Sequence, residues 1–568
     1  MAVPEGLKDG WTISTAIICA LAVTPVAAVV YLALTPEPGD DIWSHLVSTV
    51  LPDYIITTVG LMIGVGIGTV LIGVSAAWLV TMCRFPGRRI FEWAMLLPMA
   101  MPAYVIAYVY TDILEYAGPV QGMLREMFGW QTGRDYWFPE IRSLGGAISM
   151  MTLVLYPYVY LLSRAAFLEQ SIGVLEASRV LGRGPWHGFF TVALPLARPG
   201  IVIGLSLVLM ETLNDFGTVD FFAVNTFSLG IFDVWMNMSN VSGAAQLATV
   251  LLLFVALLVL SERYARRKQR FHNTSSKYQA LPGLRLRGKL GLLAMTICAL
   301  PVLLGFVLPT WILIEYAVQY FDPLLASEIA GYAWNSIKLS LLAGGLAVVV
   351  AIVIAYSVRI RGGQVLTSLS RLASLGYAVP GAVLAVGVMN VLGPLDNSID
   401  AYSRETFGIS TGLIFSGTIA AVTFGYLVRF LALSLGTVEA GLGKITPNMD
   451  GAARSLGHGA LSTMRRVHMP LMRTSVLTAV MLVFVDCMKE LPMTTILRPF
   501  NFQTLATFVH QYASDEQLGE AALAALSIVG VGILPVILLS YAIARSRPGH
   551  GQVMARPRQK NKMSKGSR

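Results

Sequence analysis

The chain has 568 residues, of which 55% are hydrophobic and 13% are charged, and its formal net charge is +9. So large an apolar fraction excludes an ordinary soluble globular domain and favours an all-α polytopic membrane protein. We attribute the excess of Lys and Arg to membrane topology, and we expect a lipid membrane but no nucleic acid among the partners.

Apolar segments of about 20 residues are long enough to cross a bilayer as helices. The first segment follows Lys8 and is too long for the apolar region of a signal peptide, so we expect a retained first span. The sequence predicts about twelve spans, in chain order at roughly 11–35, 54–82, 92–112, 144–163, 200–220, 243–261, 290–316, 335–358, 373–395, 411–435, 475–497 and 519–543.

Lys and Arg residues concentrate in alternate loops, which indicates the orientation of the spans. With the N-terminus inside, 34 of the 41 fall on the cytoplasmic face, including six at 429–473. Both termini are therefore predicted to be cytoplasmic.

The chain offers no obvious metal or catalytic site. Its cysteines form no CxxC pair, its seven histidines are scattered, and no GxSxG or HExxH pattern occurs. The stretch GLGKIT at 441–446 lacks the spacing of a nucleotide-binding loop. We therefore expect no catalytic residue, no metal ligand and no disulfide from Cys19, Cys83, Cys298 and Cys487.

A hydrophilic stretch at 261–289 divides the predicted spans six and six. Residues 176–217 align without gaps to 451–492, with 11 identities in 42 positions. The sequence thus predicts two tandem six-helix halves. Because each half has an even number of spans, the halves enter the membrane in the same direction, and we expect a path between them.

The repeat begins with a cytoplasmic loop, EASRVLGRGPWHGFFTVALPLARPG at 176–200 and GAARSLGHGALSTMRRVHMPLMRTS at 451–475. Small residues and a glycine turn suit close approach of another surface. An amphipathic loop lying on the membrane is the alternative, but two copies at equivalent places favour docking of a partner.

The first copy resembles the loop signature of permease subunits of bacterial binding-protein-dependent ABC importers, with the type-1 transmembrane fold. The matching residues are Glu176, Ala177, Ser178, Gly182, Val192, Leu194 and Pro195. The second copy keeps Ala452, Ala453, Gly457, Val467 and Pro470 but has Gly451 in place of the glutamate.

The resemblance implies that both loops, with Arg179 and Arg454, couple the permease to two cytoplasmic ATPase subunits that bind ATP and Mg. The chain would be a multi-pass protein of the inner membrane and a transport subunit, without a cofactor of its own. The expected domains are 1–53 (first span and external loop), 54–261 (first type-1 transmembrane domain), 262–289 (basic cytoplasmic linker), 290–334 (span and external loop), 335–541 (second type-1 domain) and 542–568 (basic cytoplasmic tail).

Four carboxylates fall at repeat-equivalent places within predicted spans: Glu211 and Asp215, and Asp486 and Glu490. The spacing of four residues predicts one face of one helix in each copy. One interpretation is an acidic gate or path for a cation. The other is a network between helices in which Lys489 pairs with an aspartate, Asp215 or Asp486, and Asn214 and Thr212 complete the hydrogen bonds.

Three further stretches, 102–121, 211–235 and 488–526, resemble iron(III) permeases of the importer family, whose two halves are commonly fused. This implies import of Fe(III) received from a periplasmic iron-binding protein. Import of thiamine, a polyamine or another small solute remains an alternative, and a proton-coupled secondary transporter is the alternative from another class.

Overall fold

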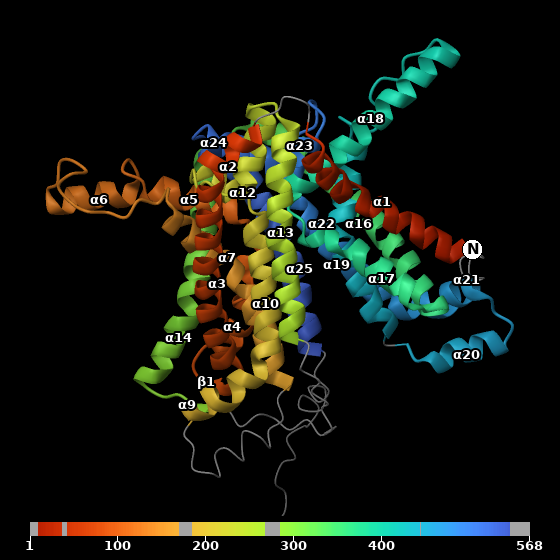
Figure 1. Cartoon of the computed structure of the whole chain (residues 1–568). Helices are drawn as coiled ribbons and strands as arrows, with labels where there is room; N and C mark the ends of the chain where they lie inside the picture. Colours follow the sequence, from red (N-terminus) through yellow and green to blue (C-terminus); the bar gives the residue numbers. More distant parts are fainter. Residues whose placement is uncertain (1–9, 37–41, 170–184, 267–283, 444, 546–568) are drawn as a thin grey trace, which may run out of the picture.

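The computed structural model describes residues 10–36, 42–169, 185–266, 284–443 and 445–545, and these are almost entirely helical (Figure 1). Helices dominate because a backbone in lipid has to satisfy its polar groups internally. The main helices are α1 (Gly10–Leu34), α2 (Ile42–Thr49), α3 (Leu51–Met82), α4 (Arg88–Ala94), α5 (Ala103–Leu114), α6 (Pro119–Phe128), α7 (Leu144–Glu169), α9 (Pro185–Gly188), α10 (Leu194–Asn214), α11 (Gly217–Phe221), α12 (Phe227–Phe232), α13 (Val241–Arg266), α14 (Lys289–Val302), α15 (Leu308–Gln319), α16 (Pro323–Arg361), α17 (Gln364–Ala373), α18 (Gly381–Phe407), α19 (Ile419–Gly443), α20 (Pro447–Ser455), α21 (Ala460–Thr463), α22 (Met469–Met488), α23 (Pro492–Leu497), α24 (Leu505–Ser514) and α25 (Leu518–Arg545).

Short 3₁₀ and π segments join some of these helices, and two short strands pair in parallel. The 3₁₀ segments are η2 (Leu97–Ala100) and η6 (Ser374–Ala378); the π segments are η3 (Phe189–Ala193), η4 (Asp233–Asn237), η5 (Leu303–Val307) and η7 (Met464–His468); the strands are β1 (Cys83–Arg84) and β2 (Leu284–Arg285).

Within the described ranges, eleven helices are long and apolar enough to cross a membrane. The third predicted span is instead a broken pair, Arg88–Ala100 and Ala103–Phe128, which meet at 89°. The break falls before Pro102, since a residue that precedes proline is disfavoured in the helical conformation. The prediction of an all-α polytopic membrane protein is confirmed, with twelve spans if the bent pair counts as one.

The order of elements recurs in the same register as the repeat in the sequence. Helix α9, segment η3, helix α10 and helix α11 begin at positions that the alignment of 176–217 with 451–492 pairs with the starts of α21, η7, α22 and α23, respectively. Segments η3 and η7 each lie directly before a helix whose second residue is proline, Pro195 and Pro470, respectively. The missing proline N–H interrupts the regular hydrogen-bond ladder there, and the wider π turn takes up the interruption.

Two groups of packed helices form the body of the molecule (Figure 1). Helices α3, α7 and α10 pack together in one group, and α16, α19 and α22 pack together in the other. The ends of the chain join the groups: α1 crosses to α17 and α18, while α25 packs against α15 and η2. The buried core is accordingly shared between segments that lie far apart in the sequence.

Helices α3, α7 and α10 approach one another through glycines. A Cβ atom at Gly73 would lie 2.8 Å from the backbone nitrogen of Tyr160 and 2.8 Å from Cβ of Val159, and a Cβ at Gly204 would lie 2.9 Å from Cα of Val159. Small residues allow membrane helices to pack closely in this way.

Replacing Gly73 by Ala should therefore destabilise the protein by about 1–3 kcal/mol, because backbone atoms would have to move. The matched control is Gly436→Ala in α19, where an added Cβ meets no atom within 4 Å. Thermal unfolding in detergent should show a lower melting temperature for Gly73→Ala and an unchanged or higher one for the control, because Ala is the better helix former. Equal melting temperatures would contradict the close packing.

Candidate functional site

Two adjoining cavities lie where the two helix groups meet. The first has a volume of about 110 Å³ and is lined by residues of α5, α7, α10, α19 and α22, by the segment before α5 and by the segments that follow α10 and α22. The second has a volume of about 290 Å³ and a more apolar lining. Both are lined by Met99, Tyr158, Asp486 and Lys489, so these residues form the partition between them.

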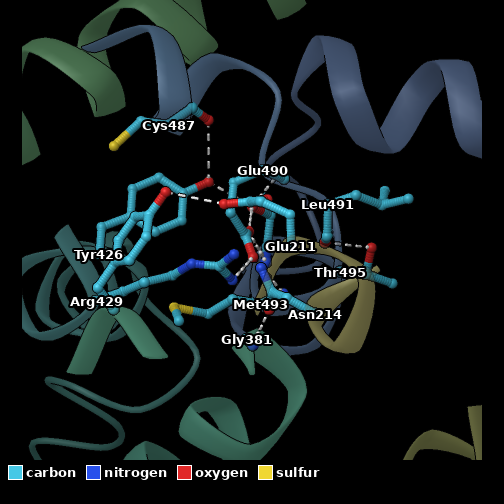
Figure 2. A network of polar contacts seen from close by, with 12 residues as sticks. Glu211, Asn214, Gly381, Tyr426, Arg429, Cys487, Glu490, Leu491, Met493 and Thr495 are labelled. Atoms are coloured by element: carbon cyan, nitrogen blue, oxygen red, sulfur yellow. Dashed lines mark hydrogen bonds and ion pairs between the residues drawn. The ribbon is translucent and has the colours of Figure 1, made fainter. Parts of the chain in front are cut away.

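Glu490 is the most completely bonded group of the first cavity (Figure 2). Its Oε1 atom accepts hydrogen bonds from Nη1 of Arg429 and from the backbone N–H of Met493, both at 3.0 Å. Its Oε2 atom accepts from the backbone N–H of Thr494 at 3.0 Å and from the Thr494 hydroxyl at 2.8 Å. The side chains of Glu490 and Arg429 are 2% and 7% exposed, so a buried ion pair holds α23 to α19.

Asp215 lies two residues before the start of α11, as Glu490 lies two residues before the start of α23. Its carboxylate accepts from the backbone N–H groups of Thr218 at 3.0 Å and Val219 at 3.4 Å, and from the Thr218 hydroxyl at 3.1 Å. These N–H groups belong to the first turn of a helix and have no partner within that helix. Asp215 and Glu490 therefore cap equivalent short helices.

This arrangement corrects the prediction that Glu211 and Asp215, like Asp486 and Glu490, lie on one face of one helix. Helix α10 ends at Asn214 and α22 ends at Met488, short of the predicted ends at 220 and 497. Asp215 has an extended backbone with ψ of 132°, so the chain turns there. The reason is the capping itself, because each carboxylate serves the helix that follows it.

One ion pair of the site lies within the second helix group, and two hydrogen bonds connect the two groups. Nζ of Lys489 lies 3.1 Å from Oδ1 of Asp486, and the Tyr377 hydroxyl donates to Oε1 of Glu211 at 2.9 Å. Oδ1 of Asn214 accepts from the backbone N–H of Gly381 at 2.7 Å, a contact drawn in Figure 2.

Of the predicted network between helices, Lys489 pairs with Asp486 only within its own segment, and the link between helices runs through Asn214. Thr212 is not part of it, because its hydroxyl donates to the Val208 carbonyl of its own helix.

Arg429 is the residue of this site that the sequence reasoning missed. The charge count assigned it to the cytoplasmic face with the group at 429–473, whereas it is 6% exposed within α19. An arginine among apolar residues, in LVRFLALSL, was the available signal, since a charge inside a span needs a partner. The residue at the equivalent place in the first helix group is Val154, which also lines the cavity.

The lining of the first cavity carries a negative excess. Glu211, Asp215, Asp486 and Glu490 oppose two cations, Arg429 and Lys489. No group of three or more His, Cys, Asp or Glu side chains that could hold a metal ion occurs in the part of the chain that the structure describes. The arrangement suits passage of a cation better than its tight storage.

The structure describes most of the second predicted coupling loop but only the end of the first. Glu176, Ala177, Ser178, Arg179 and Gly182 lie outside the described residues. Pro195 lies at the start of α10.

In the second loop, Ala452, Ala453 and Arg454 lie on α20, which projects from the lower right of the molecule in Figure 1. Gly457 follows α20 with φ of +79°, a conformation that favours glycine, and Pro470 is the second residue of α22.

Asp450, one residue before Gly451, fixes the second loop to the body. Its carboxylate accepts from Nε of Arg359 at 3.0 Å and lies 2.6 Å from Nε2 of His468. Arg359 also donates to the backbone carbonyls of Leu442 and Ile445. The Asp450 carboxylate is therefore engaged with the body of the molecule. It does not replace, on the loop surface, the glutamate of the loop signature that Gly451 lacks.

Comparison with known proteins agrees with this architecture. Residues 69–270 match the family described as the inner membrane component of binding-protein-dependent transport systems. The chain thus carries the domain of this permease family, and the resemblance to ABC importer permeases is confirmed. It is a multi-pass inner-membrane transport protein.

Similar proteins have several stated substrates. The chain is 27% identical to an Fe(3+)-transport system permease protein of Haemophilus influenzae, over 85% of this chain and 88% of the relative. It is 23% identical to a ferric transport system permease protein of Actinobacillus pleuropneumoniae, over 84% and 68%. It is 28% identical to a sulfate transport system permease protein of Escherichia coli, over 44% and 90%.

Replacing Arg429 by Gln should destabilise the protein by about 3–5 kcal/mol, because Glu490 would stay buried without its cation. The double variant Arg429→Gln/Glu490→Gln should recover part of this loss. Arg404→Gln, which removes an exposed pair with Asp400, is the control and should cost less than about 1 kcal/mol. Thermal unfolding in detergent measures all three. A stability of Arg429→Gln equal to that of the control would contradict the buried pair.

Proposed function

We propose that this chain is the transmembrane permease of an ATP-driven importer that moves Fe(III) into the cytoplasm. The observation that carries the proposal is the small central cavity, whose lining has two more negative than positive groups. Charged groups at this depth are costly, and they commonly mark the path of an ion.

The negative charge of the cavity lining favours some of the relatives' stated substrates over others. The sulfate permease has an anionic substrate, and an anion would be repelled by a cavity in which four carboxylates oppose two cations. Two relatives that are similar over more than four fifths of this chain are described as ferric permeases. Both observations favour Fe(III), and the charge alone would also accept thiamine or a polyamine.

Two parallel halves, 54–261 and 335–541, would enclose the path, preceded by first-span regions at 1–53 and 290–334. The recurrence of helix starts in the register of the sequence repeat supports this division. The linker at 262–289 and the tail at 542–568 are rich in Lys and Arg, which supports cytoplasmic termini.

Two separate ATPase subunits would bind ATP with Mg and hydrolyse it. The first loop, with Glu176, Gly182 and Pro195, would contact one subunit, and the second loop, with Ala452, Ala453 and Gly457, would contact the other. The projection of α20 from the body supports such docking. A periplasmic binding protein would deliver iron at the opposite face.

Access would alternate by movement of the two helix groups. The partition of Asp486, Lys489 and Tyr158 separates the two cavities, and Tyr377 joins Glu211 across the groups. When the ATPase subunits move the coupling loops, these cross-group contacts would break and re-form, and the cation would pass from one cavity to the next.

Proteoliposomes that hold this chain with its ATPase subunits should take up radiolabelled Fe(III) only with the binding protein outside and ATP inside. Radiolabelled sulfate should not enter. The variants Asp215→Asn and Glu490→Gln should reduce iron uptake about tenfold or more, since each removes one charge from the path. Iron uptake without ATP would indicate a secondary transporter, and ATP-dependent uptake of another solute would refute iron as the substrate.

Replacing Glu176 by Ala together with Gly182 by Val should lower both iron uptake and stimulation of ATP hydrolysis while leaving the melting temperature of the permease unchanged. The reason is that the loop acts on the partner and not on the buried core. The control is the same pair of substitutions made in α6, Glu126→Ala at an exposed position and Gly122→Val at a half-buried one, where an added Cβ would meet only the Arg125 side chain, at 4.0 Å. Normal stimulation of ATP hydrolysis in the loop variant would refute the assignment of this loop.

A further inference from the structure

Tyr104 of α5 is a lining residue of the first cavity with an unused polar atom. The residue is 5% exposed, and its hydroxyl oxygen is buried with no hydrogen-bond partner among the described residues. A buried hydroxyl without a partner costs about 1–3 kcal/mol, so such groups call for a functional or structural reason.

The Tyr104 side chain packs closely against the backbone of Gly217. A Cβ atom at Gly217 would lie 2.8 Å from Cβ and 3.2 Å from Cγ of Tyr104, so only glycine leaves room for this ring. Gly217 is the first residue of α11, the short helix that Asp215 caps. The phenol ring and the capped helix are therefore fixed against each other at the edge of the cavity.

The neighbouring carboxylates already have partners. Both oxygens of Glu490 accept two hydrogen bonds each, and both oxygens of Asp215 accept from α11. Tyr104 differs from them because its oxygen keeps its full capacity for a ligand. The oxygen is buried in this conformation, so a cation reaches it when the wall of the cavity moves, and no protein hydrogen bond has to break first.

The chemistry of the group matches a hard cation. Hard cations prefer oxygen ligands, and a tyrosine oxygen is an established ligand of ferric iron in haem proteins. A cavity of about 110 Å³ has room for an ion with a few water molecules.

We propose that the hydroxyl oxygen of Tyr104 is a transient ligand of the transported cation, and that Asp215 and Glu490 supply the negative field around it. The proposal rests on the proposed function and adds a residue to it. On coordination the oxygen–iron bond forms, the O–H bond breaks, and the proton passes to water in the cavity. Release of the ion towards the second cavity reverses the step, so no proton is consumed overall.

The substitution Tyr104→Phe removes only the oxygen and keeps the ring that packs against Gly217. The matched control is Tyr156→Phe in α7, because Tyr156 is also fully buried with an unpartnered hydroxyl but does not line this cavity. Both variants should fold, since each replaces an unsatisfied polar group by an apolar one of the same shape.

The first readout is uptake of radiolabelled Fe(III) by the complete transporter in proteoliposomes. We expect a fall of about tenfold or more for Tyr104→Phe, a ligand-loss effect of the size known for metal sites, and wild-type uptake for Tyr156→Phe. Equal uptake by wild type and Tyr104→Phe would overturn the role of Tyr104 and leave iron import intact. Absence of iron uptake by the wild type would overturn the proposed function itself.

The second readout is visible absorption of the detergent-purified chain after addition of Fe(III). Coordination by a tyrosine oxygen should give a phenolate-to-iron charge-transfer band that is present in wild type and Tyr156→Phe and absent in Tyr104→Phe. A band that persists in Tyr104→Phe would assign the ligand to another tyrosine and overturn the proposal.

Discussion

The structure depends on one repeated interaction, a buried carboxylate that caps a short helix at the point where a long apolar helix ends. Asp215 and Glu490 each accept the backbone N–H groups three and four residues ahead. Inside a membrane those N–H groups cannot form hydrogen bonds with water. A helix that is interrupted there therefore requires such an acceptor. The same requirement brings carboxylates to the middle of the molecule, where we propose the cation path.

The two copies of this interaction are not equivalent. Glu490 is neutralised by Arg429 at 3.0 Å, whereas the residue at the corresponding place beside Asp215 is Val154. The buried ion pair mainly fixes the position of α23, because its Coulomb energy is offset by the cost of removing both charges from water. The half with the uncompensated carboxylate also contributes Tyr104, which places both polar groups on one wall.

Much of the fold could be predicted from the sequence, because apolar length and the alternation of basic loops are strong signals for helices in lipid. The repeat of 176–217 at 451–492 likewise anticipated the recurring helix starts. The break before Pro102 and the early ends of α10 and α22 could not be read from apolarity, because they depend on capping by groups that look like ordinary span residues. The carboxylates of the site were recognised by their repeat, whereas Arg429 and Tyr104 have no repeat counterpart that would have singled them out.

We propose that the acidic cavity lies on a path that selects cations. The most direct test is the reaction of Ala103→Cys, a lining position, with thiol reagents of equal size and opposite charge, in proteoliposomes that contain the ATPase subunits. The four native cysteines are buried and provide the background. We expect reaction with the cationic reagent at least about ten times faster than with the anionic one, because the lining attracts positive charge. Equal rates, a faster anionic reagent, or no reaction from either side of the membrane would contradict it.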